Sequence, residues 1–295
     1  MRVAVIGGNG QLGTDVASAF SSEGHEVFRL AHCDVEVSDL DSIRKCTDRF
    51  QPQLLVNTSA MHHVENCERD PGTALAVNAI GPRNLALVAR DMDAVLMHVS
   101  TDYVFDGHKR TPYLEDDLPL PLNVYGCSKL TGELFIRSLT EKHFILRTSA
   151  IYGQNPCRAK GGLNFVELML KLARERGEVR VVNSEFVSPT STVELARLMV
   201  VLSATDHYGL YHATAEGSCS WFEFAREIFS MTDTPVSLKV ASSSEFPAKV
   251  PRPQYSVLEN HRLKSHGLNI FDSWQNALRN YLGSRVAKAP AHAIA

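Results

Sequence analysis

The sequence lacks several features that would assign it to a specialised class of protein. None of its 295 residues belongs to an apolar run of the 18 or more that a transmembrane helix needs. The apolar start, Met1–Ile6, is too short for the hydrophobic core of a signal peptide, and glycines follow it where a cleavage site would stand. We therefore expect a soluble, cytoplasmic protein with no membrane partner.

Clustered cysteine and excess charge are also missing. The six cysteines include no C-x-x-C pair and no short spacing suited to a tetrahedral zinc site, so we expect reduced thiols and no metal. The adjacent His62 and His63 diverge on any regular element and have no third ligand at a clear spacing. A formal net charge of -3 excludes a general attraction to nucleic acid, so any anion site must be local.

What the sequence does contain is a regular alternation of apolar runs and helical periodicity. The expected strands are Val3–Ile6, Glu26–Leu30, Leu54–Asn57, Val95–Val99 and Phe144–Leu146. The expected helices are Gln11–Ser22, Leu40–Phe50, Pro71–Met92 and Val124–Leu139. This alternation predicts an α/β fold, a Rossmann-type doubly wound parallel sheet with helices on both faces.

The alternation becomes less regular after residue 150. A helix near Asn164–Arg176, a strand near Val179–Val182 and a helix from Thr192 are separated by longer loops. We expect a first, Rossmann-type domain over residues 1–150 and a smaller mixed C-terminal domain over residues 151–283, with some segments around 178–200 returning to the first. The polar, alanine-rich residues 284–295 are expected to form a disordered tail.

A glycine turn follows the first expected strand directly. Residues 7–13 read G-x-x-G-x-x-G and open into a helix. Gly7 permits a tight exit from the strand, Gly10 lets the backbone approach a pyrophosphate, and Gly13 lets the helix pack closely. The helix N-terminus adds unpaired N–H donors. In this context the motif predicts a dinucleotide-binding turn rather than a turn without a ligand.

The end of the second expected strand bears on which dinucleotide is bound. Residues 29–32 read R-L-A-H, with no acidic residue directly at the strand end. Arg29 and His32 are therefore candidates to face a 2′-phosphate, which favours NADPH. Asp34 or Glu36 at the ribose would favour NADH instead. The alternative for Arg29 is a solvated cation at the end of a strand.

A third group of residues has a spacing that suits carbonyl reduction. Thr101 follows the strand Val95–Val99, and Tyr125 and Lys129 form Y-x-x-x-K on one face of an expected helix. Reducing a ketone creates an alkoxide, which needs a proton from a positioned acid. Tyr125 would give that proton, Lys129 would lower the pKa of the tyrosine and hold the nicotinamide ribose, and Thr101 would polarise the substrate oxygen. The alternatives are a half-exposed helix face and a turn-capping hydroxyl.

Together these segments resemble the dTDP-4-dehydrorhamnose reductase family of the extended short-chain dehydrogenase/reductase superfamily. The resemblance reaches about Tyr281 and covers residues 7–13, 35–39, 57–68, 77–79, 100–107, 121–126, 147–149, 164–165, 189–190 and 252–253. It implies catalytic roles for Thr101, Tyr125 and Lys129. The expected cofactor contacts are Gly7, Gly10, Gln11, Leu12 and Gly13 at the turn, Arg29, Glu36 and Val37 at the adenosine, Ala60 at the wall and Lys129 at the ribose. The expected substrate contacts are Asp102, Tyr103, Asn164 and Arg252.

The resemblance implies a reductase of a 4-keto group on a nucleotide-linked deoxysugar, using NADPH, and the superfamily suggests a homodimer. The departures fall around the substrate. The family has a tryptophan, stacked on the sugar, where this sequence has Ala150, residues 60–65 read A-M-H-H-V-E, and Gln254 follows Pro253 where the family has asparagine. The chemistry therefore transfers better than the identity of the sugar. The alternative is that another aromatic side chain compensates for Ala150.

Two other functions share the fold. A nucleotide-sugar epimerase or dehydratase would use the same Tyr125–Lys129 pair but regenerate its cofactor within each cycle. A non-catalytic cofactor-binding regulatory subunit would keep the dinucleotide site alone, and the intact Thr101, Tyr125 and Lys129 argue against it.

Overall fold

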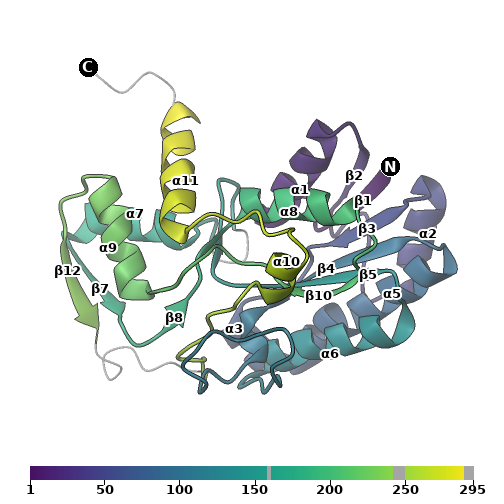
Figure 1. Cartoon of the computed structure of the whole chain (residues 1–295), viewed down its shortest axis with the longest axis horizontal. Helices are drawn as coiled ribbons and strands as arrows, with labels where there is room; N and C mark the ends of the chain where they lie inside the picture. The colour runs from purple at the N-terminus through teal and green to yellow at the C-terminus, as the bar shows by residue number, and fades with distance from the viewer. Residues whose placement is uncertain (158–160, 242–249, 289–295) are drawn as a thin grey trace.

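The computed structural model describes residues 1–157, 161–241 and 250–288. A six-stranded sheet forms the centre of the larger half of the molecule (Figure 1). All its neighbouring strands are parallel and follow the order β10-β5-β4-β3-β1-β2. Their bounds are β1(Arg2–Ile6), β2(Glu26–Leu30), β3(Leu54–Asn57), β4(Val95–Thr101), β5(His143–Thr148) and β10(Gly209–His212). The predicted Rossmann-type parallel sheet is confirmed.

Helices cover both faces of this sheet (Figure 1). Val3 and Val5 of β1 pack with Phe20 of α1(Gln11–Ser22) and with α8(Thr192–Ser203), while Ala4 and Ile6 point to the opposite face. That second face is covered by α2(Leu40–Phe50), α5(Gly81–Asp91) and α6(Val124–Leu139). Because both faces are covered, the inner strands β1 and β3 contain runs of buried apolar residues rather than alternating ones.

The predicted helix Pro71–Met92 is wrong as a single element. After α3(Val64–Arg69), the chain forms α4(Pro71–Leu75), a π-helical segment η1(Ala76–Ile80) and then α5. Pro82 has no N–H to donate to the carbonyl four residues earlier, and the Gly81 N–H bonds Ala76 instead, five residues back. The proline thus explains why the regular helix is interrupted.

The C-terminal half has its own small sheets and core. β7(Glu178–Val182) pairs in parallel with β12(Ser237–Ala241), and α7(Phe165–Arg176), α9(Trp221–Met231) and α11(Trp274–Lys288) enclose the apolar residues between them. Two further short pairs are β6(Ile151–Tyr152) with β9(Thr190–Ser191), in parallel, and β8(Phe186–Val187) with β11(Cys219–Ser220), antiparallel.

The chain crosses between the two halves more than once. Within the segment 178–200 that was expected to return, α8 packs on α1, whereas β7 pairs with β12 in the C-terminal half. β10 and α10(His261–Ser265) also lie in the sheet half, although the sequence placed both in the second domain. Four residues gave too short an apolar run to reveal that β10 belongs to the central sheet.

The expected disordered tail is wrong for its first residues, because α11 continues to Lys288. Ser284 accepts a hydrogen bond from Gln154, and Arg285 pairs with Glu167 at 2.6 Å. Residues 289–295 of that predicted tail lie outside the described residues. In the part of the chain that the structure describes, no helix is long and apolar enough to cross a membrane.

Candidate active site

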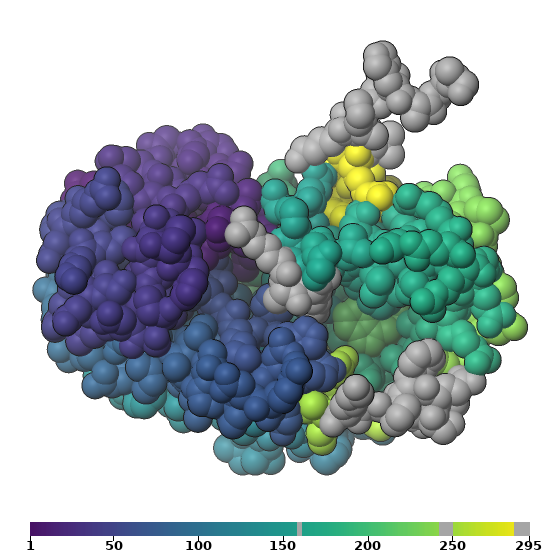
Figure 2. Space-filling view, turned by 180° about the vertical axis from the view of Figure 1, so that it is seen from behind, coloured from purple at the N-terminus to yellow at the C-terminus, as the bar shows by residue number. Residues whose placement is uncertain are grey.

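A cleft of about 540 Å³ opens at the carboxyl ends of the central strands, between the sheet half and the C-terminal half. Figure 2 shows the two halves side by side, the sheet half in purple and blue and the C-terminal half in green. Fifteen candidate site residues from the sequence line the cleft: Gly7, Gly10, Gln11, Leu12, Gly13, His32, Glu36, Val37, Ala60, Thr101, Asp102, Tyr103, Tyr125, Lys129 and Asn164. The structure therefore brings together three motifs that are far apart in the sequence. Arg29 and Arg252 are described residues that do not line it.

The glycine turn forms one end of the cleft. Gly7 has a φ of 76°, and a Cβ there would lie 2.8 Å from the Thr58 hydroxyl. A Cβ on Gly13 would overlap the Gly7 carbonyl, so the first turn of α1 packs directly on the glycine turn. Gly10 caps α1 with a single close neighbour for an added Cβ, the Gly7 carbonyl at 3.2 Å. The N–H groups of Gly7, Gly8 and Gly10 donate to carbonyls inside the protein, so the backbone donors that fit a pyrophosphate are those of the first turn of α1, which no side chain caps.

Arg29 does not reach the cleft as predicted. Its Nε donates to the Gly8 carbonyl at 3.1 Å and its Nη2 donates to the Thr14 hydroxyl at 3.2 Å. The guanidinium therefore braces the glycine turn from outside. Side-chain direction on the edge strand β2 decides this, and sequence spacing does not reveal it.

His32 and Glu36 supply the polar groups at the same end of the cleft. His32 Nδ1 lies 3.3 Å from the Glu36 carboxylate, and the imidazole is 87% exposed. The Ser38 N–H and hydroxyl donate to Glu36 at 2.9 and 2.8 Å. The backbone hydrogen bond from Ser38 is the main reason that the pKa of Glu36 lies below its ordinary value. The Glu36 carboxylate is therefore ionised and can accept a hydrogen bond from a ligand in the cleft.

Thr101 and Asp102 form the floor of the cleft at the end of β4. The Thr101 hydroxyl donates to Asp102 Oδ1 at 3.0 Å and accepts from the Tyr103 N–H at 3.2 Å. Asp102 also accepts from the hydroxyls of Ser149 at 2.8 Å and Ser256 at 2.5 Å. Burial raises the pKa of Asp102, and these hydroxyl donors lower it. The carboxylate expected to bind substrate is thus engaged inside the protein, where it holds Thr101.

Tyr125 lies in the first turn of α6, which Asn123 caps by accepting from the Gly126 N–H at 2.9 Å. The phenol is half-buried, and the Tyr103 ring meets it edge-on with centroids 5.8 Å apart. Burial raises the pKa of Tyr125 above its ordinary value, and the Thr101 hydroxyl lowers it. The sequence predicted a pKa lowered by Lys129, and the structure shows the opposite direction. A raised pKa keeps the phenol protonated, which is the state that a proton donor needs.

Lys129 follows one helical turn later and is 1% exposed. Its Nζ donates to the Val99 carbonyl at 2.6 Å and lies 3.1 Å from His98 Nε2. Burial lowers the pKa of Lys129 to about 8, although the nearby Glu133 carboxylate raises it. The amine therefore changes charge close to neutral pH.

The C-terminal half supplies an aromatic wall whose two residues the sequence interpretation did not identify. Phe165 and Trp221, the first residues of α7 and α9, line the cleft with ring centroids 4.5 Å apart. Ala150, with a φ of 45°, lines it as well. The signal available in the sequence was an aromatic residue directly after each capping residue, Asn164 and Ser220. The aromatic surface at this end therefore comes from these two rings and not from position 150.

Two of the residues expected to bind substrate are occupied by other contacts. Asn164 accepts from the Glu167 N–H at 3.0 Å and donates to the Gly153 carbonyl at 2.7 Å, so it caps α7. Arg252 pairs with Glu65 at 2.5 Å outside the cleft lining. The Arg252 Nε is buried and has no hydrogen-bond partner among the described residues, so Glu65 does not engage the whole guanidinium.

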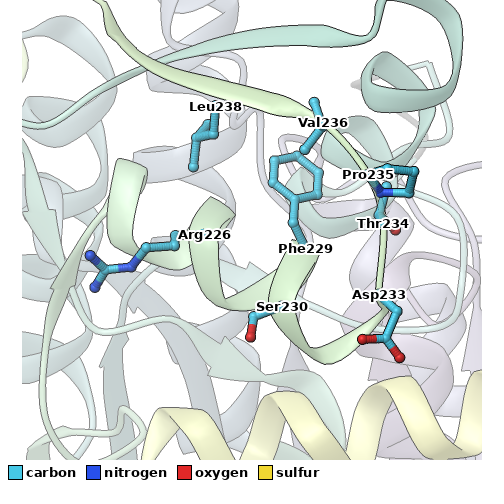
Figure 3. Close-up of a pocket in the computed structure, with 8 residues that line it drawn as sticks. All are labelled: Arg226, Phe229, Ser230, Asp233, Thr234, Pro235, Val236 and Leu238. Atoms are coloured by element: carbon cyan, nitrogen blue, oxygen red, sulfur yellow. The ribbon is translucent and has the colours of Figure 1, made fainter.

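A second hollow lies between the C-terminal end of α9 and the segment that leads into β12 (Figure 3). Arg226 and Asp233 are its charged residues, and Phe229 and Leu238 contribute apolar surface. It contains none of the residues singled out from the sequence. Within the described ranges, no group of three His, Cys, Asp or Glu side chains is placed to hold a metal ion.

The fold and the cleft define a Rossmann-type α/β protein with a nucleotide-binding glycine turn. The model of the family described as "RmlD substrate binding domain" matches residues 1–286, and the chain belongs to this family. It is 38% identical to the "Spore coat polysaccharide biosynthesis protein SpsK" of Bacillus subtilis (strain 168), over 96% of this chain and 98% of that protein. It is 35% identical to a dTDP-4-dehydrorhamnose reductase of Streptomyces griseus, over 94% and 91%.

Solved structures agree with this assignment. The crystal structure of dTDP-4-dehydrorhamnose reductase from Bacillus anthracis str. Ames in complex with NADP has a TM-score of 0.91 to this chain. The two share 35% sequence identity, over 96% of this chain and 99% of that chain. The family named from the sequence motifs is therefore confirmed.

Proposed function

We propose that the protein is an NADPH-dependent reductase of a keto group on a nucleotide-linked deoxysugar, of the dTDP-4-dehydrorhamnose reductase kind. The observation that carries this proposal is the convergence of Thr101, Tyr125 and Lys129 on one cleft with the glycine turn. Two kinds of relative support it. The chain matches dTDP-4-dehydrorhamnose reductases over nearly their whole length, and one such reductase has been solved in complex with NADP.

The residues present fit a nicotinamide dinucleotide. The turn around Gly7 and Gly10 would hold the pyrophosphate, His32 and Glu36 would face the adenosine ribose, and Lys129 would reach the nicotinamide ribose. When bound, the reduced dinucleotide supplies hydride to the substrate carbonyl carbon. The side chains of this protein place the carbonyl and handle the proton.

Proton delivery belongs to Tyr125. Its phenol is protonated at neutral pH and lines the cleft beside Thr101, so it is placed to protonate the developing alkoxide. The Thr101 hydroxyl, which Asp102 holds in place, forms a side-chain hydrogen bond with the phenol and fixes the position of its oxygen. In this arrangement Tyr125 contacts the substrate oxygen, and Asp102 acts through Thr101 as a positioning residue.

We further propose that the enzyme is of the short-chain dehydrogenase/reductase type, works in the cytoplasm and forms a homodimer through helices flanking the sheet. Leu134 on α6, Leu75 on α4 and Ile80 on η1 are exposed apolar side chains on neighbouring elements. Such an apolar surface suits a symmetric contact. A Leu134→Glu variant that stays dimeric in light scattering would contradict this interface.

One experiment separates the proposed reductase from its alternatives. Purified protein is mixed with NADPH and a panel of nucleotide-linked keto sugars, and loss of the reduced nicotinamide absorbance is followed. Oxidation stoichiometric with product supports the reductase. Product without net oxidation identifies an epimerase or dehydratase, and binding without turnover identifies a regulatory subunit. Either of the last two results contradicts the proposal.

A further inference from the structure

A line of three buried polar side chains runs beneath the cleft. Asn57 at the end of β3 and His98 on β4 are both 0% exposed and are paired in the register of the two strands. Asn57 Nδ2 lies 3.0 Å from His98 Nδ1, and His98 Nε2 lies 3.1 Å from Lys129 Nζ. Both ring nitrogens of His98 thus have a nitrogen as their neighbour, so the position of each hydrogen matters.

The orientation of the Asn57 amide is fixed by Ser59. The Ser59 backbone N–H donates to Asn57 Oδ1 at 3.1 Å, and the Ser59 hydroxyl contacts the same oxygen at 2.6 Å. A backbone N–H can only donate, so the amide oxygen must face Ser59 and the NH₂ group must face His98. It follows that His98 Nδ1 accepts this hydrogen bond and carries no hydrogen.

A neutral imidazole carries one hydrogen, so here it lies on Nε2 and points at Lys129 Nζ. An ammonium group has donors only, whereas a neutral amine has a lone pair that accepts. The His98 Nε2–H bond therefore requires an uncharged Lys129. A charged Lys129 would move the imidazole hydrogen to Nδ1, where it would face the Asn57 NH₂ donor to donor in a buried site.

Other charged and titratable groups surround Lys129. Glu133 lies one turn further along α6, and Arg147 from β5 holds it in a buried ion pair at 2.7 Å. Tyr125 lies one turn earlier on the same helix, and from β4 the Val99 carbonyl accepts from Lys129. Because Arg147 engages the Glu133 carboxylate, the negative charge nearest Lys129 is largely balanced. Besides burial and Glu133, the hydrogen on His98, 3.1 Å away, then bears on the charge of Lys129.

We infer that Asn57 and His98 are positioning residues that set the protonation state of Lys129: the Asn57 amide selects the Nε2–H tautomer of His98, and that tautomer favours the uncharged amine. The lowered pKa of Lys129 and the pKa of His98, held well below its ordinary value by burial and by Lys129, agree in direction. The kinetic consequence of the inference rests on the proposed reductase function, and the tautomer itself does not.

The Asn57→Asp variant provides the sharpest test. A carboxylate keeps the shape and the Ser59 contacts but accepts from His98, so it selects Nδ1–H and leaves an Nε2 lone pair for a charged Lys129. Asn57→Ala is the matched control, because it removes the selection without imposing the opposite tautomer. Nitrogen NMR of the protein without cofactor reads the tautomer, and a His98→Gln spectrum identifies the His98 signals among the 12 histidines.

We expect an Nε2–H signal for His98 in the unmodified protein and Nδ1–H in Asn57→Asp. In turnover assays, the dependence of kcat/KM on pH has a limb that we assign to Lys129. In Asn57→Asp this limb should move to higher pH by about one unit, a tenfold change in the protonation equilibrium of Lys129. In Asn57→Ala it should move by less. An Nδ1–H signal in the unmodified protein overturns the inference even if no variant folds. If the protein proves not to be a reductase, the NMR result still decides whether His98 has the inferred Nε2–H tautomer.

Discussion

Arg147 donates three hydrogen bonds to Glu133 in a site closed to solvent. Nε donates to Oε1 at 3.0 Å and to Oε2 at 3.2 Å, and Nη2 donates to Oε2 at 2.7 Å. The two side chains are only 2% and 1% exposed. The guanidinium carbon also lies 5.1 Å from the centre of the Phe105 ring. This pair joins β5 to the helix that carries Tyr125 and Lys129.

Removing one partner of this pair should destabilise the protein strongly. Glu133→Gln keeps the shape but leaves Arg147 buried without a counter-charge, so the free energy of unfolding should fall by about 3–5 kcal/mol. Urea denaturation followed by circular dichroism measures it. Glu175→Gln, which breaks the exposed Lys171–Glu175 pair, is the control and should change little. Equal, small losses in both variants would contradict a structural role for the buried pair.

Tyr125→Phe should remove proton delivery while leaving the ring in place. We expect kcat to fall by roughly 10²–10⁴, the usual contribution of general acid catalysis, with an unchanged melting temperature. Steady-state kinetics with the keto-sugar substrate measures the effect. Tyr103→Phe, whose ring meets Tyr125 edge-on, should alter KM more than kcat. A fully active Tyr125→Phe protein would rule out the proposed proton donor.

Cofactor selectivity should depend on His32 and not on Arg29. Arg29→Ala removes the contacts to Gly8 and Thr14 that brace the turn, so NADPH and NADH should lose affinity to the same extent. His32→Ala removes an imidazole of the cleft lining that we propose faces the adenosine ribose, so the loss should be larger for NADPH. Calorimetric titration with both cofactors gives the two ratios. A loss confined to NADPH in Arg29→Ala would restore the assignment made from the sequence.

Gly10→Val should abolish dinucleotide binding without unfolding the protein. Within the described structure, an added Cβ meets only the Gly7 carbonyl at 3.2 Å, and the remaining space is where the pyrophosphate would lie. Calorimetry with NADPH measures affinity, and circular dichroism checks folding. Gly72→Ala is the control, because its Cβ would be 3.6 Å from Asp70, in ordinary contact. Unchanged affinity in Gly10→Val would show that the turn does not hold the cofactor.

Acid should destabilise the protein through His212. Burial lowers the pKa of this imidazole from 6.5 to about 3, and its Nδ1 lies 3.0 Å from the Tyr113 carbonyl, which can only accept. Between these values the unfolded chain binds a proton that the folded protein does not, so stability is present above 6.5 and falls with decreasing pH, by at most about 1.4 kcal/mol per unit. Urea unfolding at pH values spanning 4 to 7 should show a flatter dependence in His212→Asn. An equally steep dependence in the variant would exclude His212.

Local sequence signals were sufficient for much of the fold. α1, α2, α6, β2 and β3 have the predicted bounds, because amphipathic periodicity and capping residues such as Asp39 and Asn123 define helices locally. Pro82 was visible in the sequence, yet a π-helical segment that continues the helical path was not. The motif spacing likewise predicted one cleft for Thr101, Tyr125 and Lys129. Thr101 ends β4, and Tyr125 and Lys129 lie in the first turns of α6 and line the same cleft.

What the sequence could not reveal depends on side-chain direction and on distant partners. Arg29 turns toward the glycine turn and His32 toward the cleft, although both belong to the same strand end. His98 stands within an apolar strand, and its pairing with Asn57 follows only from the register of β3 with β4. Phe165 and Trp221 meet only because α7 and α9 pack together in the C-terminal half.

The position of β10 has a consequence for synthesis of the chain on the ribosome. β5 ends at Thr148, and its outer neighbour begins at Gly209, so residues 149–208 must be made before that edge can be paired. At roughly 5–20 residues per second, the nascent sheet waits about 3 to 12 seconds with a row of free backbone groups on β5. An open edge of this kind pairs readily with other unfinished chains. Crowded polysomes and shortages of chaperone should therefore reduce the yield of folded protein, even though the finished molecule has this edge covered.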